Sequence, residues 1–301
     1  MKALDPSKIQ VANAAWAANA QVARSGNGGL PYYLFANMAD QPGLVHGIFT
    51  RRGGKSRAPF NTLNVGLGIG DSPGAVAENR RRVATCLGVD RLIFTHQVHA
   101  NGIRVFRQGD RHGATGFHNP KRSGDAMITD VPGICLAIQV ADCQAVVLYD
   151  KDRAVVANIH SGWRGSIINI IGKTVEAMTA AFGCDPGSLL AGVSPSLGPC
   201  CAEFVNFQRE IPEKFWPYRV SPDHFDFWAI SRDQLIQAGV PIENIEITAC
   251  CTRCHPEQFF SYRAERVTGR FVVAAGLLGK VGGRPEDGRP EIRNQRPGEN
   301  E

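Results

Sequence analysis

The sequence predicts an α+β fold, because strand-like segments follow one another instead of alternating strictly with helices. Three consecutive segments, 134–140, 145–149 and 154–159, are rich in apolar and β-branched residues, and one helical pattern follows them. Hydrophobic residues make up 43% of the 301 residues, which is enough for a substantial core. We therefore interpret most of the chain as one large domain.

Three helices are predicted from their end signals and their apolar spacing. The first begins with Ser72 and Pro73, residues typical of a helix start, and ends at Gly88. Apolar residues at helical spacing predict a second helix within 165–183, and a third is expected over 226–239. Further strands are predicted at 92–94, 103–106 and 245–249.

The two ends of the chain differ in composition from the part between them. Residues 1–29 are rich in Ala and Asn, and we predict a mobile N-terminal extension there that can include a short helix. Residues 280–301 are dominated by Gly, Pro, Arg and Glu, a composition that predicts a disordered tail. Residues 30–279 are then the single catalytic domain.

The formal charge of +5 is modest, and most basic residues are dispersed along the chain. A surface for duplex nucleic acid would need more clustered Lys and Arg, so nucleic acid is not expected as a partner. Small groups of arginine beside a pocket instead favour an anionic small molecule or phosphate. The oligomeric state is left open by the sequence.

The cysteine content favours a reducing compartment. Nine cysteines include two adjacent pairs, Cys200–Cys201 and Cys250–Cys251, which make a poor disulfide framework. No apolar run reaches the roughly 18 residues of a membrane span, and the N-terminus is not a convincing signal peptide. We therefore expect a cytoplasmic protein that does not enter a membrane.

Three residues are candidates for a metal site. Cys143 and His160 lie at the ends of strand-like runs, and His99 follows another such run. One thiolate and two imidazoles form a suitable ligand set for zinc, with one position open for water or substrate. Separations of 44 and 17 residues do not by themselves show a metal site. A buried thiol and a hydrogen-bonded core histidine are the alternative interpretation of the same residues.

Nine ordered sequence blocks resemble the YfiH type of laccase-domain protein, a family described both as polyphenol oxidases and as purine nucleoside enzymes. The resemblance covers about residues 31–279. Its blocks include Gln-Val-His at 97–99, Ala-Asp-Cys at 141–143 and His-Ser-Gly-Trp-Arg-Gly at 160–165. The other blocks are 46–54, 64–66, 78–80, 125–126, 198–201, and 260–263 together with 268–270.

The resemblance implies two packed mixed β-sheets flanked by helices, and a metal, usually zinc, held by His99, Cys143 and His160. The same three residues would be catalytic. The implied reactions are phosphorolysis of adenosine, inosine and S-methyl-5'-thioadenosine, and deamination of adenosine. The partners would be purine nucleosides and phosphate.

The multi-copper label within this family can be tested by counting histidines. Multi-copper oxidases hold several copper ions with many imidazoles, whereas this chain has eight histidines and no His-x-His sequence. Four-copper oxidase chemistry is therefore excluded. Copper can still enter a Cys/His/His site, because it binds most such ligand sets more tightly than zinc does.

Two arginines are predicted to bind substrate. Arg51 lies in a Gly-rich turn suited to phosphate, and Arg164 lies at the start of a predicted helix. We expect Arg51→Ala to weaken phosphorolysis more than deamination, since only phosphorolysis needs an anionic co-substrate. Asp142 adjoins Cys143 and is expected either to fix a histidine tautomer or to cap a turn.

A rival hypothesis needs no metal. Cys143 would be a nucleophile and His160 its base, in a cysteine hydrolase that edits peptidoglycan precursors, as described for some relatives. A metal-storage or interaction protein is a third, non-enzymatic alternative.

The sequence Cys251-Thr-Arg-Cys254-His255 follows the pattern of c-type haem attachment. Haem attachment is disfavoured because the chain has no convincing export signal. A structural zinc site formed by Cys250, Cys251, Cys254 and His255 is a second interpretation. A thiol-rich turn packed near the core is the interpretation we favour, because adjacent cysteines rarely bind the same ion.

Overall fold

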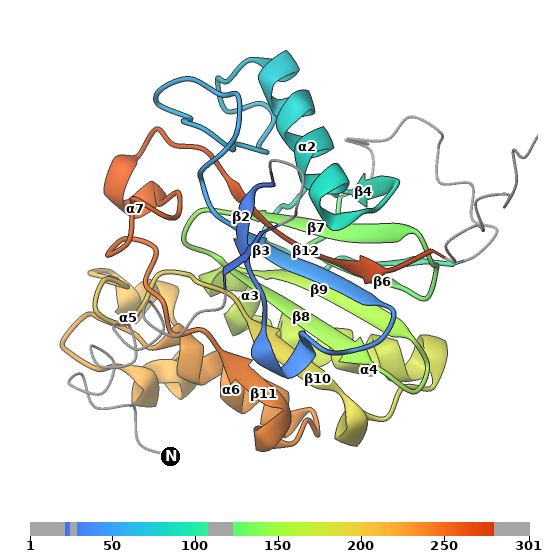
Figure 1. The fold of residues 1–301 in the computed structure, drawn as a ribbon. Helices are drawn as coiled ribbons and strands as arrows, with labels where there is room; N and C mark the ends of the chain where they lie inside the picture. The colour runs from blue at the N-terminus through green and yellow to red at the C-terminus, as the bar shows by residue number, and fades with distance from the viewer. Residues whose placement is uncertain (1–21, 25–28, 108–122, 280–301) are drawn as a thin grey trace, which may run out of the picture.

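The computed structural model describes residues 22–24, 29–107 and 123–279, whose strands form two six-stranded sheets (Figure 1). In spatial order, the first sheet contains β1 (Val22–Arg24), β2 (Pro31–Tyr33), β3 (Leu44–Phe49), β12 (Phe271–Leu277), β7 (Ile134–Val140) and β4 (Arg91–Ile93). The second contains β11 (Ile245–Ile247), β10 (Leu190–Val193), β8 (Gln144–Asp150), β9 (Val155–Ser161), β6 (Ala126–Thr129) and β5 (Ile103–Phe106).

Both sheets are mixed. The pairs β4–β7, β5–β6 and β10–β11 are parallel, whereas β7–β12, β3–β12 and β8–β9 are antiparallel. The predicted α+β class with two mixed sheets is therefore confirmed.

Six α-helices and four short 3-10 helices complete the described part of the chain. The α-helices are α2 (Pro73–Leu87), α3 (Trp163–Ile167), α4 (Ile170–Phe182), α5 (Phe207–Glu210), α6 (Phe227–Gln237) and α7 (Tyr262–Glu265). The 3-10 helices are η1 (Ala36–Met38), η2 (Pro186–Ser188), η3 (Glu213–Tyr218) and η4 (Ile242–Asn244).

The layers follow from the alternation of side chains along the strands. Ile138 and Val273 point into a core shared with Val147 of the second sheet, whereas Ala137 faces the opposite way and packs with Val83 of α2. On the outer face of the second sheet, a separate core joins strand residues to α4 and α6. The order of layers is thus helix, sheet, sheet, helices (Figure 1).

Most predicted elements are present, with ends that shift by one or two residues. The strands at 103–106 and 134–140 agree residue by residue. The helix predicted within 165–183 is instead split into α3 and α4. Asn169 lies between them with a left-handed φ of 55°, and its side chain accepts a hydrogen bond from the backbone N–H of Gly172. This cap starts a new helix and explains the break.

The predicted terminal segments are only partly described. Within 1–29, the described residues Val22–Arg24 form β1 and pair antiparallel with β2. The remainder of that segment, apart from Gly29, and the predicted tail at 280–301 lie outside the described residues. Among the helices that the structure describes, none combines the length and the apolar character needed to cross a membrane.

Candidate metal and ligand-binding site

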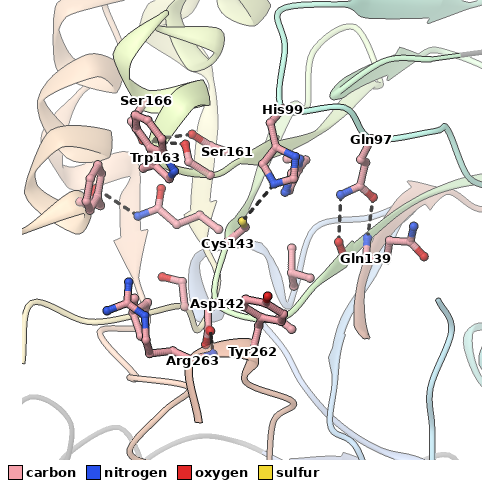
Figure 2. A pocket seen from close by; sticks show the side chains of 18 of the residues that line it. Gln97, His99, Gln139, Asp142, Cys143, Ser161, Trp163, Ser166, Tyr262 and Arg263 are labelled. Atoms are coloured by element: carbon pink, nitrogen blue, oxygen red, sulfur yellow. Dashed lines mark hydrogen bonds between the residues drawn. The ribbon is translucent and has the colours of Figure 1, made fainter. Parts of the chain in front are cut away.

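The fold brings His99, Cys143 and His160 together, although they come from three separate elements. His99 lies in the loop after β4, Cys143 lies in the turn between β7 and β8, and His160 belongs to β9. One donor atom from each residue lies within 4.8 Å of the others, and Sγ of Cys143 is 3.8 Å from Nε2 of His99 (Figure 2). The two imidazole rings meet edge to face, with centroids 4.7 Å apart.

Asp125, just before β6, binds the His160 ring and the backbone of the loop that carries His99. Its buried carboxylate accepts a 2.8 Å hydrogen bond from Nδ1 of His160 and a 2.9 Å bond from the backbone N–H of His99. The N–H groups of Val98 and Ala100 donate to the same carboxylate at 3.2 and 2.8 Å. Because Nδ1 of His160 is bonded to Asp125, Nε2 is the ring nitrogen that remains on the side of Cys143 for a metal.

The electrostatics of the site favour a thiolate. Burial by itself would raise the pKa of Cys143, but the neighbouring charge of His160 and hydrogen bonds from both histidines lower it to about 6. For His160, burial acts to lower the pKa, and the Cys143 thiolate together with Asp125 raises it to about 9. A thiolate is the form of cysteine that binds metals and also the form that acts as a nucleophile.

Backbone strain and close packing are concentrated at this site. His99 and Asp142 have φ values of 58° and 86°, in a region that residues other than glycine rarely adopt. Gly162 lies against the donors, because a Cβ atom there would be 2.9 Å from Sγ of Cys143 and 3.0 Å from the His99 ring. The surrounding structure therefore fixes where the donor atoms point.

Asp125→Asn should weaken zinc binding by about 10- to 100-fold, because the substitution removes the charge that holds His160 and the His99 loop. A chelating dye that competes for zinc would measure the change in affinity. Asp223→Asn is a matched control, since Asp223 accepts a 2.7 Å bond from Nδ1 of His224 outside this site. Unchanged zinc affinity in Asp125→Asn would contradict the assigned role.

A cavity of about 460 Å³ opens beside the three donors, a volume in the range of small-molecule sites. Aromatic side chains line part of it, namely Trp163, Phe204, Phe227 and Tyr262. The amide residues Gln97, Gln139 and Gln144 line another part. In Figure 2, Cys143 lies between His99 on one side and Asp142, Tyr262 and Arg263 on the other.

Of the two roles expected for Asp142, fixing a histidine tautomer is wrong, and capping a turn agrees with its hydrogen bonds. Its carboxylate accepts hydrogen bonds from the hydroxyls of Thr252 and Ser261, each at 2.7 Å, and from the backbone N–H of Arg263 at 2.6 Å. Asp142 thereby ties two later segments of the chain to the turn that carries Cys143. Asp125, which sequence reasoning did not single out as a site residue, performs the predicted task.

The arginines beside the cavity are not those predicted. Arg164 is exposed, with its guanidinium over the ring of Trp163, and it does not line the cavity. Arg51 lies in a separate hollow. Arg263 and Arg270 line the cavity instead, and both belong to sequence blocks that carry the family resemblance. These blocks were the feature of the sequence from which Arg263 and Arg270 could have been predicted as site residues.

Arg51 stabilises packing between distant segments. Its guanidinium donates to the carbonyls of Asn61 and Pro256 at 3.1 and 2.7 Å, contacts Glu265 at 2.8 Å, and lies 4.4 Å from the centroid of the Phe260 ring. These partners occupy the side chain. The expected selective effect of Arg51 on phosphorolysis therefore loses its structural basis.

Arg51→Ala should lower the free energy of unfolding by about 2–4 kcal/mol, because it leaves carbonyls and Glu265 without their charged partner. Any loss of nucleoside turnover should follow the loss of folded protein and be equal in every reaction. Arg52→Ala is the matched control, since Arg52 is exposed and should change stability by less than about 0.5 kcal/mol. Urea denaturation of both variants would test this, and equal stability would refute it.

The two-sheet fold and the Cys/His/His cavity define the laccase-domain class of proteins. A family model described as multi-copper polyphenol oxidoreductase laccase matches residues 45–278, and the chain belongs to this family. The sequence-based recognition of the family is thus confirmed.

Several relatives carry the name of a nucleoside enzyme. The chain is 34% identical to purine nucleoside phosphorylase YlmD of Geobacillus stearothermophilus over 247 residues, covering 78% of this chain and 90% of the relative. It is 33% identical to a purine nucleoside phosphorylase of Deinococcus radiodurans, over 84% of this chain and 96% of the relative.

Solved structures agree with these sequence matches. The crystal structure of the Bacillus licheniformis hypothetical protein YfiH matches with a TM-score of 0.73 and 29% identity, over 82% of this chain and 96% of that protein. The YlmD structure from G. stearothermophilus gives the same TM-score and identity, over 86% and 99%.

Proposed function

We propose that the protein is a zinc-dependent purine nucleoside enzyme. Its reactions would be phosphorolysis of adenosine, inosine and S-methyl-5'-thioadenosine, and deamination of adenosine. The carrying observation is one cavity that combines a Cys/His/His donor set, an aromatic wall and two arginines. Family membership and relatives named purine nucleoside phosphorylases support the proposal.

The donor set suits zinc, with copper as a second ion that it can accept. The atoms are already within 4.8 Å of one another, and Asp125 orients His160 as second-sphere carboxylates do at zinc sites. When bound, zinc would supply Lewis-acid chemistry to a ligand in the cavity. His99, Cys143 and His160 would hold it.

The other residues of the cavity match the parts of the proposed substrates. Trp163, Phe204, Phe227 and Tyr262 offer apolar faces on which a purine can stack. Arg263 and Arg270 offer positive charge for inorganic phosphate. Holding phosphate beside the ribose would convert a reaction between two dissolved partners into one between bound groups.

A chromatographic assay tests the proposal. Metal-replete protein with adenosine and phosphate should produce adenine, with some inosine from deamination. Phenols should turn over poorly or only with added copper. Folded, metal-replete protein that converts none of the three nucleosides would refute the proposed function.

A second candidate is a metal-free Cys/His hydrolase that edits peptidoglycan precursors. The observation that favours it is Cys143 beside His160, where the neighbouring imidazole lowers the thiol pKa to about 6 despite burial. Chelation separates the two candidates. The zinc enzyme should lose activity on chelation and regain it with zinc, whereas the hydrolase should cleave its amide substrate unchanged.

A further inference from the structure

A second cluster of metal-binding side chains lies outside the residues that line the cavity. Sγ atoms of four cysteines lie within 4.8 Å of one another: Cys200, Cys201, Cys251 and Cys254. The first two come from the loop after β10, and the other two come from the loop after β11. This set differs from the zinc site considered from the sequence.

Two residues of the zinc site considered from the sequence, Cys250 and His255, do not belong to the cluster. Cys250 packs into the core between the sheets, and His255 has its Nδ1 3.4 Å from Glu257. Of the adjacent pair Cys250 and Cys251 only Cys251 joins the cluster, whereas both members of the adjacent pair Cys200 and Cys201 belong to it, contrary to the general expectation for neighbouring cysteines. The second pair of cysteines comes from earlier in the chain, where sequence spacing gave no reason to look.

The spacing of the sulfurs matches a tetrahedral metal–thiolate site. Sγ of Cys254 is 3.7 Å from Sγ of Cys200 and 3.6 Å from Sγ of Cys201. Zinc–sulfur bonds of about 2.3 Å arranged tetrahedrally place neighbouring sulfurs about 3.8 Å apart. None of the four cysteines forms a disulfide, and the quoted separations are far longer than the S–S bond of about 2.05 Å.

The backbone around the cluster forms two turns that hold the sulfurs. Cys254 N–H donates to the Cys251 carbonyl at 3.1 Å, and Cys201 N–H donates to the Gly198 carbonyl at 2.8 Å. Gly198 N–H also donates to Sγ of Cys251 at 3.3 Å. A backbone N–H directed at a sulfur stabilises the thiolate form, which is the form that binds metal.

We propose that Cys200, Cys201, Cys251 and Cys254 bind a second zinc ion in a closed, structural site. Four thiolates complete a tetrahedral zinc shell, so no position remains for substrate. Soft thiolate ligands select zinc over the harder divalent ions magnesium and calcium. This site depends on its own four residues and not on the nucleoside activity.

The second zinc would stabilise the segments that form one wall of the cavity. Arg263, which lines the cavity, donates to the backbone carbonyl of Cys201 at 3.2 Å. Thr252, between the other two cysteines, donates to Asp142 beside Cys143 at 2.7 Å. An ion that joins the two cysteine turns would therefore hold both segments against the candidate active site.

Metal content of protein purified without chelator tests the proposal. Wild-type protein should contain about two zinc ions per chain, Cys143→Ala about one, and Cys254→Ser about one. The variant that combines Cys143→Ala with Cys254→Ser should contain no zinc. Cys86→Ser is the control, because Cys86 lies outside both clusters and should leave the zinc content unchanged.

X-ray absorption at the zinc edge on folded Cys143→Ala protein gives a second readout that does not require a cluster variant to fold. Four sulfurs at about 2.3 Å are expected. Cys254→Ser should also unfold at a lower temperature than the Cys86→Ser control. Folded Cys143→Ala protein without zinc, zinc bound there by nitrogen or oxygen, or a disulfide among the four cysteines would overturn the proposal. None of these measurements depends on nucleoside turnover. Failure of the proposed function would appear only in the chromatographic assay and would leave this test unaffected.

Discussion

Cys143→Ala is expected to remove one zinc ion per chain and to lower nucleoside turnover by at least about 100-fold. The substitution removes the only thiolate of the cavity site and leaves two imidazoles, which bind zinc far more weakly. The effect should exceed that of a residue that only orients a ligand, such as Asp125. His99→Ala and His160→Ala should have similar effects.

Elemental analysis and the chromatographic assay would measure these two losses on the same preparation. Cys86→Ala serves as the matched cysteine control and should retain both zinc and turnover. Circular dichroism would establish that each variant is folded. A folded Cys143→Ala protein with the zinc content of the wild type would contradict the cavity metal site.

Arg263→Ala is expected to weaken phosphorolysis by about 10- to 100-fold, mainly through a higher KM for phosphate, and to affect deamination much less. Arg263 lines the cavity, and phosphorolysis is the reaction that needs an anion held beside the sugar. Deamination in the same variant is an internal control, because it uses no phosphate.

Two further variants sharpen this comparison. Arg164→Ala removes the exposed arginine first predicted to bind substrate, and Arg81→Ala removes a surface arginine paired with Glu78 on α2. Both should keep their KM for phosphate. Equal losses of phosphorolysis and deamination in Arg263→Ala would indicate that this side chain supports the cavity wall, where it also contacts the carbonyls of Cys201 and Glu203.

The strands that were predicted carry a local signal, and several of those that were missed do not. β7 and β8 are bounded runs of apolar residues beside turn residues. β6 and β10 have only four residues each, and β12 is buried along its whole length. The predicted strands β5, with four residues, and β8, buried along its whole length, share these properties. Short or fully buried apolar runs therefore have no alternation that separates a strand from a helix, and their pairing partners decide the conformation.

The three candidate ligand residues could be proposed from the sequence because the family blocks marked them, and the structure brings their donor atoms together. The surroundings could not be proposed in the same way. Asp125 and His160 are hydrogen-bonded although 35 residues separate them in the sequence, and Thr252 and Asp142 are hydrogen-bonded across a separation of 110 residues. Such contacts depend on how the sheets pack, which residue type and local spacing do not encode.

The sequence by itself determined the α+β class, the family and the chemical nature of the three donors, because these depend on local patterns and on residue type. Tertiary structure alone decided which arginines line the cavity, assigned the orienting role to Asp125, and placed Cys200 and Cys201 beside Cys251 and Cys254. The physical reason is that charge and thiol groups act over a few ångströms. Their partners are set by the packing of segments far apart in the chain.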